Sequence, residues 1–257
     1  MPLSWQNATL EARMRVDLSG RTAVVTGSAG GIGQEICRAL AESGARVVGF
    51  DVADQSATAA ACEGKFQALR VDVTDPASVQ EAAGRIEGDQ ASSVVIHAAG
   101  KFPNRPFPEW TFAQFEDLWR LNVGGVFNVT QALLPGMREL GWGRIITIST
   151  QAIFLAIPGF VPYVSTKSAL IGFTRSLAAE VGAEGITVNA ITPGLLATDA
   201  ALTGDVAPSF DSVVAGQIIQ RRGQASDLTS TVLYLCDGDS GFITGQTINV
   251  DGGAVVH

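Results

Sequence analysis

Short runs of apolar and β-branched residues alternate with helical patterns along nearly the whole chain. After the first run, Ile36, Leu40 and Ala41 have the spacing of one helix face. Repeated succession of strand, helix and strand is typical of a parallel sheet with helices on both faces, in which ligands bind at the carboxyl ends of the strands. The sequence therefore predicts an α/β fold built on a doubly wound parallel sheet. The predicted strands span residues 23–25, 46–50, 66–71, 94–96, 144–148 and 186–191, and a closing strand spans 244–250.

A glycine-rich turn, Thr26–Gly33, joins the first run to its helix. Glycines at such a turn let backbone approach a pyrophosphate closely, and the following helix presents free N–H groups and the positive end of its dipole. The turn therefore predicts dinucleotide binding and, with it, a single-domain Rossmann-like fold. The candidate cofactor contacts in the turn are Gly27, Ala29, Gly30, Gly31, Ile32 and Gly33.

The second run ends at Asp51, about twenty residues beyond the glycines, where a carboxylate can accept hydrogen bonds from both adenosine ribose hydroxyls. The same carboxylate would repel a 2′-phosphate. Neither the glycine turn nor Val52 and Ala53 supplies an Arg or Lys that would compensate for the charge of a phosphate. Asp51 and the adjoining Val52 therefore predict NAD rather than NADP as the cofactor.

Further candidate cofactor contacts follow later strands. Asp72 and Val73 stand at the end of the third run, where the adenine edge would lie. Ala98, Ala99 and Gly100 close the fourth run. Their small side chains would allow backbone to pass close to a bound cofactor.

Tyr163 and Lys167 lie four residues apart in a helical pattern, so they share one helix face. A tyrosine hydroxyl titrates near pH ~10, so acid/base work near neutrality requires stabilising its phenolate by about 4 kcal/mol. A nearby lysine cation supplies part of that stabilisation. The pair is therefore a candidate for proton transfer.

Composition narrows the possible partners and ligands. The net charge is −8 and Lys and Arg form no cluster, whereas nucleic acids and anionic membranes require a positive surface. Small neutral substrates fit better. Residues 1–16 hold no continuous apolar run, so neither a signal peptide nor a transmembrane helix is expected, and we predict a cytoplasmic protein. The isolated Cys37, Cys62 and Cys236 predict neither disulfides nor a metal site.

Taken together, these stretches resemble the short-chain dehydrogenase/reductase family over essentially the whole chain from about Leu18 onward. The resemblance implies an N-terminal extension, 1–17, followed by one dinucleotide-binding and catalytic domain, 18–257. It rests on two matched patterns, Thr-Gly-x-x-x-Gly-x-Gly in the glycine turn and Tyr-x-x-x-Lys at Tyr163 and Lys167.

The resemblance also implies a catalytic set, Asn122, Ser149, Tyr163 and Lys167. In the family the tyrosine is the acid/base, and the lysine holds the nicotinamide ribose and lowers the pKa of the phenol. The serine orients the substrate oxygen, and the asparagine supports a proton-relay water. Each role is expected of the corresponding residue here.

Two further stretches compare with the family. Its Pro-Gly after the sixth strand is matched by Pro193 and Gly194, which places Leu196 and Thr198 near the nicotinamide. Its usual Asn-Asn-Ala-Gly after the fourth strand is replaced by a segment that begins with His97. Because an imidazole can still donate and accept hydrogen bonds, we expect altered local bonding rather than lost activity.

The substrate is expected to meet a mainly apolar pocket with few polar groups. Gln151 is the expected partner for a substrate hydrogen bond, and residues 195–220 have the composition of a mobile lid. The aromatic residues Phe102 and Phe154 flank the same strand ends. The candidate substrate contacts are Ser149, Gln151, Ile153, Phe160, Tyr163 and Leu195.

The leading hypothesis is an NAD-dependent oxidoreductase that moves a hydride between nicotinamide and a small secondary alcohol, polyol, sugar or hydroxy acid, or the corresponding carbonyl. One alternative is a 3-oxoacyl thioester reductase acting on carrier-protein or coenzyme A esters. Another is a non-catalytic nucleotide sensor or scaffold on the same fold. Because an apolar closing strand, Gln246–Val250, needs cover, and because the resembled family usually assembles so, we expect a homotetramer.

Overall fold

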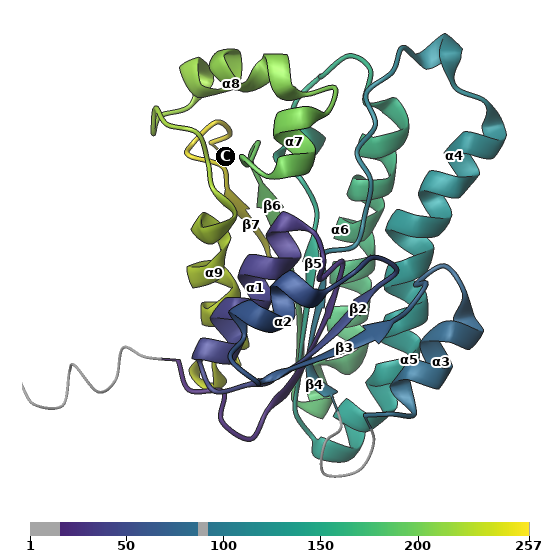
Figure 1. Ribbon diagram of the computed structural model, residues 1–257, viewed down its shortest axis with the longest axis vertical. Helices are drawn as coiled ribbons and strands as arrows, with labels where there is room; N and C mark the ends of the chain where they lie inside the picture. Colours follow the sequence, from purple (N-terminus) through teal and green to yellow (C-terminus); the bar gives the residue numbers. More distant parts are fainter. Residues whose placement is uncertain (1–15, 87–91, 257) are drawn as a thin grey trace, which may run out of the picture.

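The computed structural model describes residues 16–86 and 92–256, so most of the expected N-terminal extension lies outside the described residues. Parallel strands form one sheet in the order β3-β2-β1-β4-β5-β6-β7 (Figure 1). This arrangement confirms the doubly wound α/β fold. The strands are β1 (Thr22–Thr26), β2 (Arg46–Asp51), β3 (Phe66–Arg70), β4 (Ser92–His97), β5 (Gly143–Ile148), β6 (Ile186–Pro193) and β7 (Thr247–Val250).

The strand order reverses at β1. The chain runs outward from β1 to β3 and then crosses back to place β4 on the other side of β1. At the carboxyl end of β1, Thr26 is paired with Phe50 of β2 and with His97 of β4. Such a switch point leaves a crevice beyond the strand ends, which is where open α/β sheets bind ligands.

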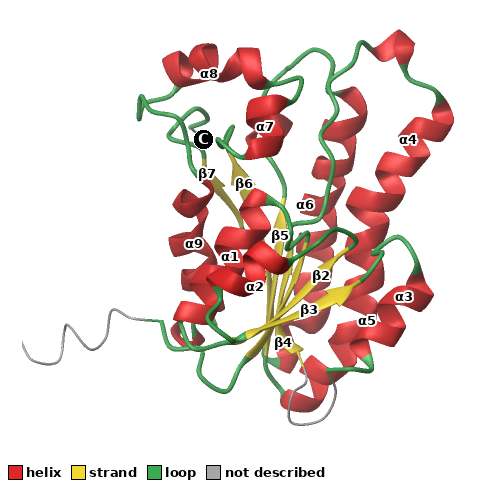
Figure 2. Cartoon of the chain, viewed as in Figure 1, coloured by secondary structure: helices red, strands yellow, loops and turns green. Residues whose placement is uncertain are grey.

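Helices cover both faces of the sheet, with α1, α2 and α9 on one side and α3, α5 and α6 on the other (Figure 2). Side chains of successive strand residues alternate between these layers. Val25 of β1 packs in the core under α1, whereas Val24 packs in the core under α5. The helices are α1 (Gly31–Glu42), α2 (Ser56–Ala61), α3 (Pro76–Ala83), α4 (Phe112–Trp119), α5 (Gly125–Leu140), α6 (Val161–Val181), α7 (Asp199–Thr203), α8 (Phe210–Gly216) and α9 (Thr229–Cys236).

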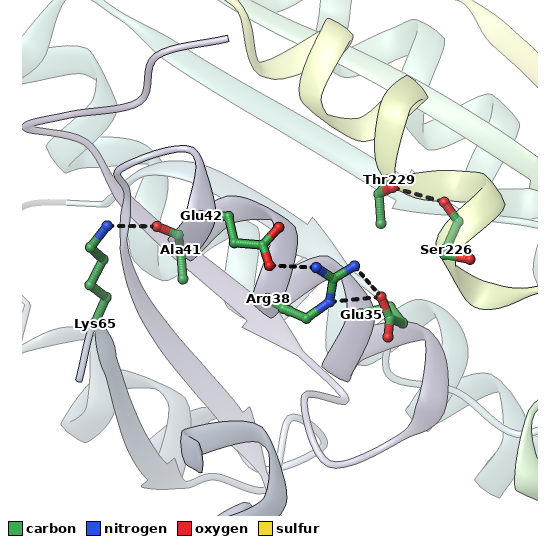
Figure 3. A network of polar contacts seen from close by, with 7 residues as sticks. All are labelled: Glu35, Arg38, Ala41, Glu42, Lys65, Ser226 and Thr229. Atoms are coloured by element: carbon green, nitrogen blue, oxygen red, sulfur yellow. Dashed lines mark hydrogen bonds and ion pairs between the residues drawn. The ribbon is translucent and has the colours of Figure 1, made fainter. Parts of the chain in front are cut away.

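The outer face of α1 is polar (Figure 3). The guanidinium of Arg38 pairs with Glu35 at 2.8 Å and with Glu42 at 2.5 Å, and Lys65 Nζ donates to the Ala41 carbonyl at 3.0 Å. Solvent-exposed pairs of this kind contribute less than about 1 kcal/mol each. The position of α1, and with it the glycine turn, is therefore fixed mainly by its buried face.

Two segments differ from the sequence-based expectation. The apolar residues Leu118, Leu121, Val126, Val129 and Leu133 predict one helix over residues 112–137, but a π-helical turn, Arg120–Gly124, divides it into α4 and α5. The closing strand starts at Thr247 rather than at residue 244, because the Thr244 hydroxyl accepts a hydrogen bond from the Val188 N–H instead. Within the described residues, no helix combines the length and apolarity needed to cross a membrane.

Candidate active site

A groove of about 830 Å³ lies along the switch point, at the carboxyl ends of β1, β2 and β4. It is also lined by Trp110, which precedes α4, by Gln114 and Leu118 of α4 and by Leu121 of the turn that follows. Sequence reasoning missed Gln114, Leu118 and Leu121 as groove residues, because nothing in their pattern marks them. The candidate cofactor contacts that line the groove are Gly27, Ala29, Gly30, Asp51, Val52, Asp72, Val73, Ala98, Ala99 and Gly100.

The glycine turn brings two backbones into close contact. A Cβ at Gly27, whose φ is +70°, would lie 2.7 Å from the Ala99 nitrogen and Cα. A Cβ at Gly33 would lie 2.1 Å from the Gly27 carbonyl oxygen, and one at Gly31 would lie 3.0 Å from Thr198 Cγ2. Gly31 and Gly33 do not line the groove. Gly33 is needed for close packing of α1 against the turn, and Gly31 leaves room for the Thr198 side chain.

Asp51 is half-buried at the end of β2 and already accepts two hydrogen bonds. Its Oδ2 accepts from the Ala29 N–H and its Oδ1 from the Ala53 N–H, both at 2.9 Å. A carboxylate has about four acceptor sites, so two remain for ribose hydroxyls. The exposed Val52 beside it carries no charge. The carboxylate is thus oriented by the N–H groups of Ala29 and Ala53. Arg70 of β3 is its partner in the strand register but does not line the groove.

A second cavity of about 230 Å³ opens from the same groove, with which it shares Ala98, Gly100 and Lys101. It holds the reactive side chains at the ends of β5 and β6. Ile153 is not among the residues that line it, since its turn directs it elsewhere. The candidate contacts that do line it are Ile32, Ser149, Gln151, Phe160, Tyr163, Lys167, Pro193, Gly194, Leu195, Leu196 and Thr198.

Tyr163 and Lys167 both project from α6 into this cavity. Burial raises the pKa of Tyr163 to about 12, against a smaller lowering by a hydrogen bond with Thr150. Burial lowers the pKa of Lys167 to about 8, and its Nζ donates to the Ile148 carbonyl at 2.7 Å. Burial, not Lys167, therefore sets the direction of the shift, and the phenol is protonated at neutral pH.

The hydroxyl beside Tyr163 belongs to Thr150, not to Ser149. Ser149 Oγ donates to the Lys167 backbone carbonyl at 2.9 Å, so it is engaged with the α6 backbone. The next residue, Thr150, lines the cavity and its side chain hydrogen-bonds the phenol. Ser149 also lines the cavity, but its hydroxyl is engaged with α6, since successive residues leaving a strand point to opposite sides. Because residues 149 and 150 both carry a hydroxyl, the sequence alone does not show which of them faces Tyr163.

Asn122 acts as a brace. It is fully buried in the π-helical turn. Its Oδ1 accepts from the Lys101 N–H, and its Nδ2 donates to the Lys101 carbonyl and to Thr166 Oγ1, each at 3.0 Å. The amide thereby joins the loop after β4 to α6. Asn122 is thus linked to Tyr163 and Lys167 through these neighbours rather than by a direct hydrogen bond.

His97, which replaces an asparagine of the resembled pattern, is completely buried at the end of β4. Its Nε2 shares a hydrogen bond with Thr130 Oγ1 at 2.9 Å, while Nδ1 has no partner. Burial, assisted by the charge of Lys167, lowers the pKa of His97 to about 3. The imidazole is therefore neutral at pH 7, in agreement with altered local bonding. Among the described residues, no cluster of His, Cys, Asp or Glu could hold a metal ion.

Residues 195–220 cover the reaction cavity with α7 and α8, which lie beyond the carboxyl ends of β5 and β6 (Figure 1). Ala201, Val206 and Phe210 form a small core of their own. Phe102 and Phe160, whose rings lie 6.4 and 5.4 Å from that of Tyr163, pack against this core. The covering segment thus contacts the catalytic tyrosine through two aromatic rings.

Comparisons with known proteins agree with this geometry. Residues 27–255 match the family described as enoyl-(acyl carrier protein) reductase. Nodulation protein G of Azospirillum brasilense is 35% identical, over 92% of this chain and 98% of that protein. The 3-oxoacyl-[acyl-carrier-protein] reductase FabG of Haemophilus influenzae is 34% identical, over 92% and 98%.

A solved structure described as a short chain dehydrogenase/reductase family protein superposes with a TM-score of 0.84 at 33% identity, over 92% of this chain and 98% of that one. The strand order, the glycine turn and the Tyr163–Lys167 pair all agree with these matches. The chain belongs to the short-chain dehydrogenase/reductase family, whose members are oxidoreductases that use nicotinamide cofactors.

Proposed function

We propose that this protein is an NAD-dependent oxidoreductase that interconverts a small secondary alcohol and its ketone, with Tyr163 as the acid/base. One observation carries the proposal: the cavity that holds Tyr163, Lys167 and Thr150 opens directly from the nucleotide groove at Gly100. A nicotinamide at that junction would supply the hydride acceptor or donor.

The protein's own groups handle the proton and the orientation. Tyr163 takes the alcohol proton during oxidation, or returns it during reduction. Thr150 holds the same oxygen by a second hydrogen bond. Lys167 has its ammonium 2.7 Å from the Ile148 carbonyl, so it is positioned to hold a ribose hydroxyl and to favour the phenolate once a ligand excludes water. Asn122 keeps the loop at Lys101 and helix α6 in register.

The cofactor would be held along the groove by groups of different kinds. The N–H groups of the glycine turn face the pyrophosphate, Asp51 binds the adenosine ribose, and Asp72 and Val73 border adenine. The carboxylate of Asp51 is the basis for NAD over NADP. It retains free acceptor sites for ribose hydroxyls, whereas its negative charge would repel a 2′-phosphate.

A second candidate function, reduction of 3-oxoacyl thioesters, is favoured by the similarity to a protein named 3-oxoacyl-[acyl-carrier-protein] reductase. An acidic carrier protein requires free basic groups for docking. Of the scattered basic side chains Lys101, Arg105, Arg138, Arg221 and Arg222, the last three are paired with acids. Arg138 pairs with Glu184 at 2.6 Å, Arg221 with Asp227 at 2.7 Å and Arg222 with Asp211 at 3.0 Å. We therefore rank free small molecules first.

The two functions are separated by one set of assays. The full chain is incubated with NAD and a panel of secondary alcohols, and separately with acetoacetyl-coenzyme A and NADH or NADPH, while reduced nicotinamide absorbance is followed. We expect kcat/KM for the best alcohol with NAD to exceed kcat/KM for acetoacetyl-coenzyme A with NADH or NADPH. Faster reduction of the thioester would make the second candidate the function.

We also propose that the protein assembles as a homotetramer. The edge strand β7 is only half-buried, and large apolar side chains near it are exposed, among them Phe242, Ile218 and Ile219. Such a surface requires cover. Light scattering at micromolar concentration should give a mass near four chains, and a monomer would contradict the proposal.

A further inference from the structure

Gln151 is the polar side chain of the reaction cavity whose hydrogen bonding is incomplete. It is only 5% exposed, it lines the cavity, and its Oε1 has no hydrogen-bond partner. It directly follows Thr150, whose hydroxyl accepts from the Ala152 N–H at 3.2 Å and so fixes the turn that carries Gln151. An amide oxygen left unpaired in a buried site is unfavourable, and a ligand that donates a hydrogen bond removes the deficit.

The rest of the lining is mainly apolar, with Thr198 and Ser209 as further polar residues. The apolar walls are formed by Phe102, Ile157, Phe160, Leu195, Val206 and Val213. A substrate that fits has its polar atoms gathered at one end, beside Tyr163 and Gln151, and a compact apolar group at the other. A sugar or long polyol, which is polar along its whole length, does not match these walls.

Charges around the cavity disfavour anions. The covering segment carries Asp199, Asp205 and Asp211 and no basic residue. Of the two lysines that line the cavity, Lys167 donates to a backbone carbonyl and Lys101 is exposed at the mouth shared with the nucleotide groove. No buried cation remains for a carboxylate or phosphate of the substrate.

We propose that the substrate is an uncharged secondary alcohol, or its ketone, that carries a hydroxyl group on the carbon next to the reacting one, and that Gln151 selects it. The proposal rests on the proposed function and deepens it. The neighbouring hydroxyl donates to Gln151 Oε1, after rotation of the amide if required. An ether or thioester oxygen at the same place can only accept and leaves Oε1 unpaired.

The reaction is balanced by the proposed cofactor alone. A vicinal diol and NAD⁺ give a hydroxyketone, NADH and a proton. The carbinol C–H bond and O–H bond break, the hydride with its electron pair leaves for the nicotinamide, and the proton passes through Tyr163 to solvent. No further oxidant is needed.

Three uncharged probes of similar size test the donor requirement: cyclohexane-1,2-diol, 2-methoxycyclohexanol and cyclohexanol, each oxidised by the full chain with NAD. We expect the diol to exceed both others in kcat/KM by at least about tenfold, because one hydrogen bond to an otherwise unpaired group is of that order. If 2-methoxycyclohexanol or cyclohexanol equals the diol, the proposal is overturned.

Two variants test whether the Gln151 side chain causes the preference for the diol. Gln151→Leu keeps a similar volume and should reduce the ratio of diol to cyclohexanol kcat/KM to about twofold or less, given the loss of that bond. Gln80→Leu makes the same change at an exposed position of α3 and should leave the ratio as it is in the unmodified protein. An unchanged ratio in Gln151→Leu would overturn the assignment, and should that variant fail to fold, the three-probe series decides alone.

Failure of this proposal and failure of the proposed function give different results. If none of the probes reacts but acetoacetyl-coenzyme A is reduced in a Tyr163-dependent manner, the substrate class is wrong while the oxidoreductase chemistry holds. If the diol is oxidised equally well by Tyr163→Phe, the catalytic assignment itself is wrong.

Discussion

The nucleotide groove and the reaction cavity meet at Gly100, yet they are built in different ways. The groove floor is backbone at the ends of β1, β2 and β4, brought so close that a Cβ at Gly27 would overlap Ala99. The reaction cavity is walled by side chains from loops and from the short helices α7 and α8. The groove therefore depends on small residues that leave the backbone accessible, whereas the cavity depends on the identity of the side chains that line it.

Cofactor binding and substrate recognition therefore depend on different parts of the molecule. A backbone floor with a carboxylate at the end of β2, Asp51, suits one ligand, a dinucleotide, whatever the substrate. The cavity walls can change residue by residue without disturbing the sheet, because their small core of Ala201, Val206 and Phe210 is separate from the two main cores. Substitutions in the two regions should thus affect different kinetic quantities.

The largest effect is expected from Tyr163→Phe, which changes the reaction cavity alone. Loss of the acid/base should lower kcat by about 10²–10⁴-fold. NAD affinity, measured by fluorescence titration, should stay within about twofold, because the phenol is not needed to hold the groove. Turnover comparable to that of the unmodified protein would contradict the assignment of proton transfer to Tyr163.

Asp51→Ala changes the groove alone. The unmodified protein should prefer NAD over NADP by at least a hundredfold, since carboxylate hydrogen bonds contribute about 1.5–3 kcal/mol each and tenfold corresponds to 1.4 kcal/mol. The variant should lose most of this preference through weaker NAD binding, and adding Val52→Arg should then favour NADP. Asp54→Ala, an exposed acid on the same loop, is the control. Steady-state kinetics with both cofactors measure the ratio, and equal specificity constants in the unmodified protein would contradict the role of Asp51.

Thr150→Val and Ser149→Ala sharpen the comparison within the cavity itself. Removing the Thr150 hydroxyl at nearly constant shape should lower kcat/KM by about ten- to a hundredfold, because one hydrogen bond to the reacting oxygen is lost. Thr150→Ser should restore most of it. Ser149→Ala should lower the free energy of unfolding by about 1 kcal/mol through the lost bond to the Lys167 carbonyl, with little change in rate. The opposite pattern would return the catalytic role to Ser149.

The effect at His97 is on the pH dependence of stability rather than on the kinetics of either region. The unfolded chain binds a proton on this imidazole below its ordinary pKa of about 6.5, whereas the folded chain does so only near 3. Acidification from pH 6.5 toward 3 therefore favours unfolding through this group, by at most about 1.4 kcal/mol per pH unit. His97→Asn should reduce the pH dependence of the free energy of unfolding between pH 4 and 6. The reduction in slope should be up to the amount that one bound proton contributes. Denaturant titrations at several pH values measure this slope, and an unchanged slope would mean that His97 is protonated in the fold.

The sequence alone determined the doubly wound parallel sheet and the residues of the groove floor, but not those that α4 adds to the groove. Strands and helices follow local periodicity, and a glycine turn is recognisable because only glycine fits where a Cβ would meet backbone, as at Gly27 and Gly33. Tyr163 and Lys167 were found for a similar reason, since four residues along one helix is a local relation.

The tertiary structure alone decided the relations between distant segments. It chose Thr150 over Ser149, because that choice depends on which hydroxyl leaves β5 toward α6. It gave Asn122 its bracing role through a π-helical turn and left Gln151 Oε1 without a partner in a cavity walled by distant side chains. It also made burial, rather than the nearby lysine, the main influence on the pKa of Tyr163. Local pattern fixes periodicity and backbone conformation, but desolvation and hydrogen-bond satisfaction depend on everything that packs around a group, and only the folded chain brings that together.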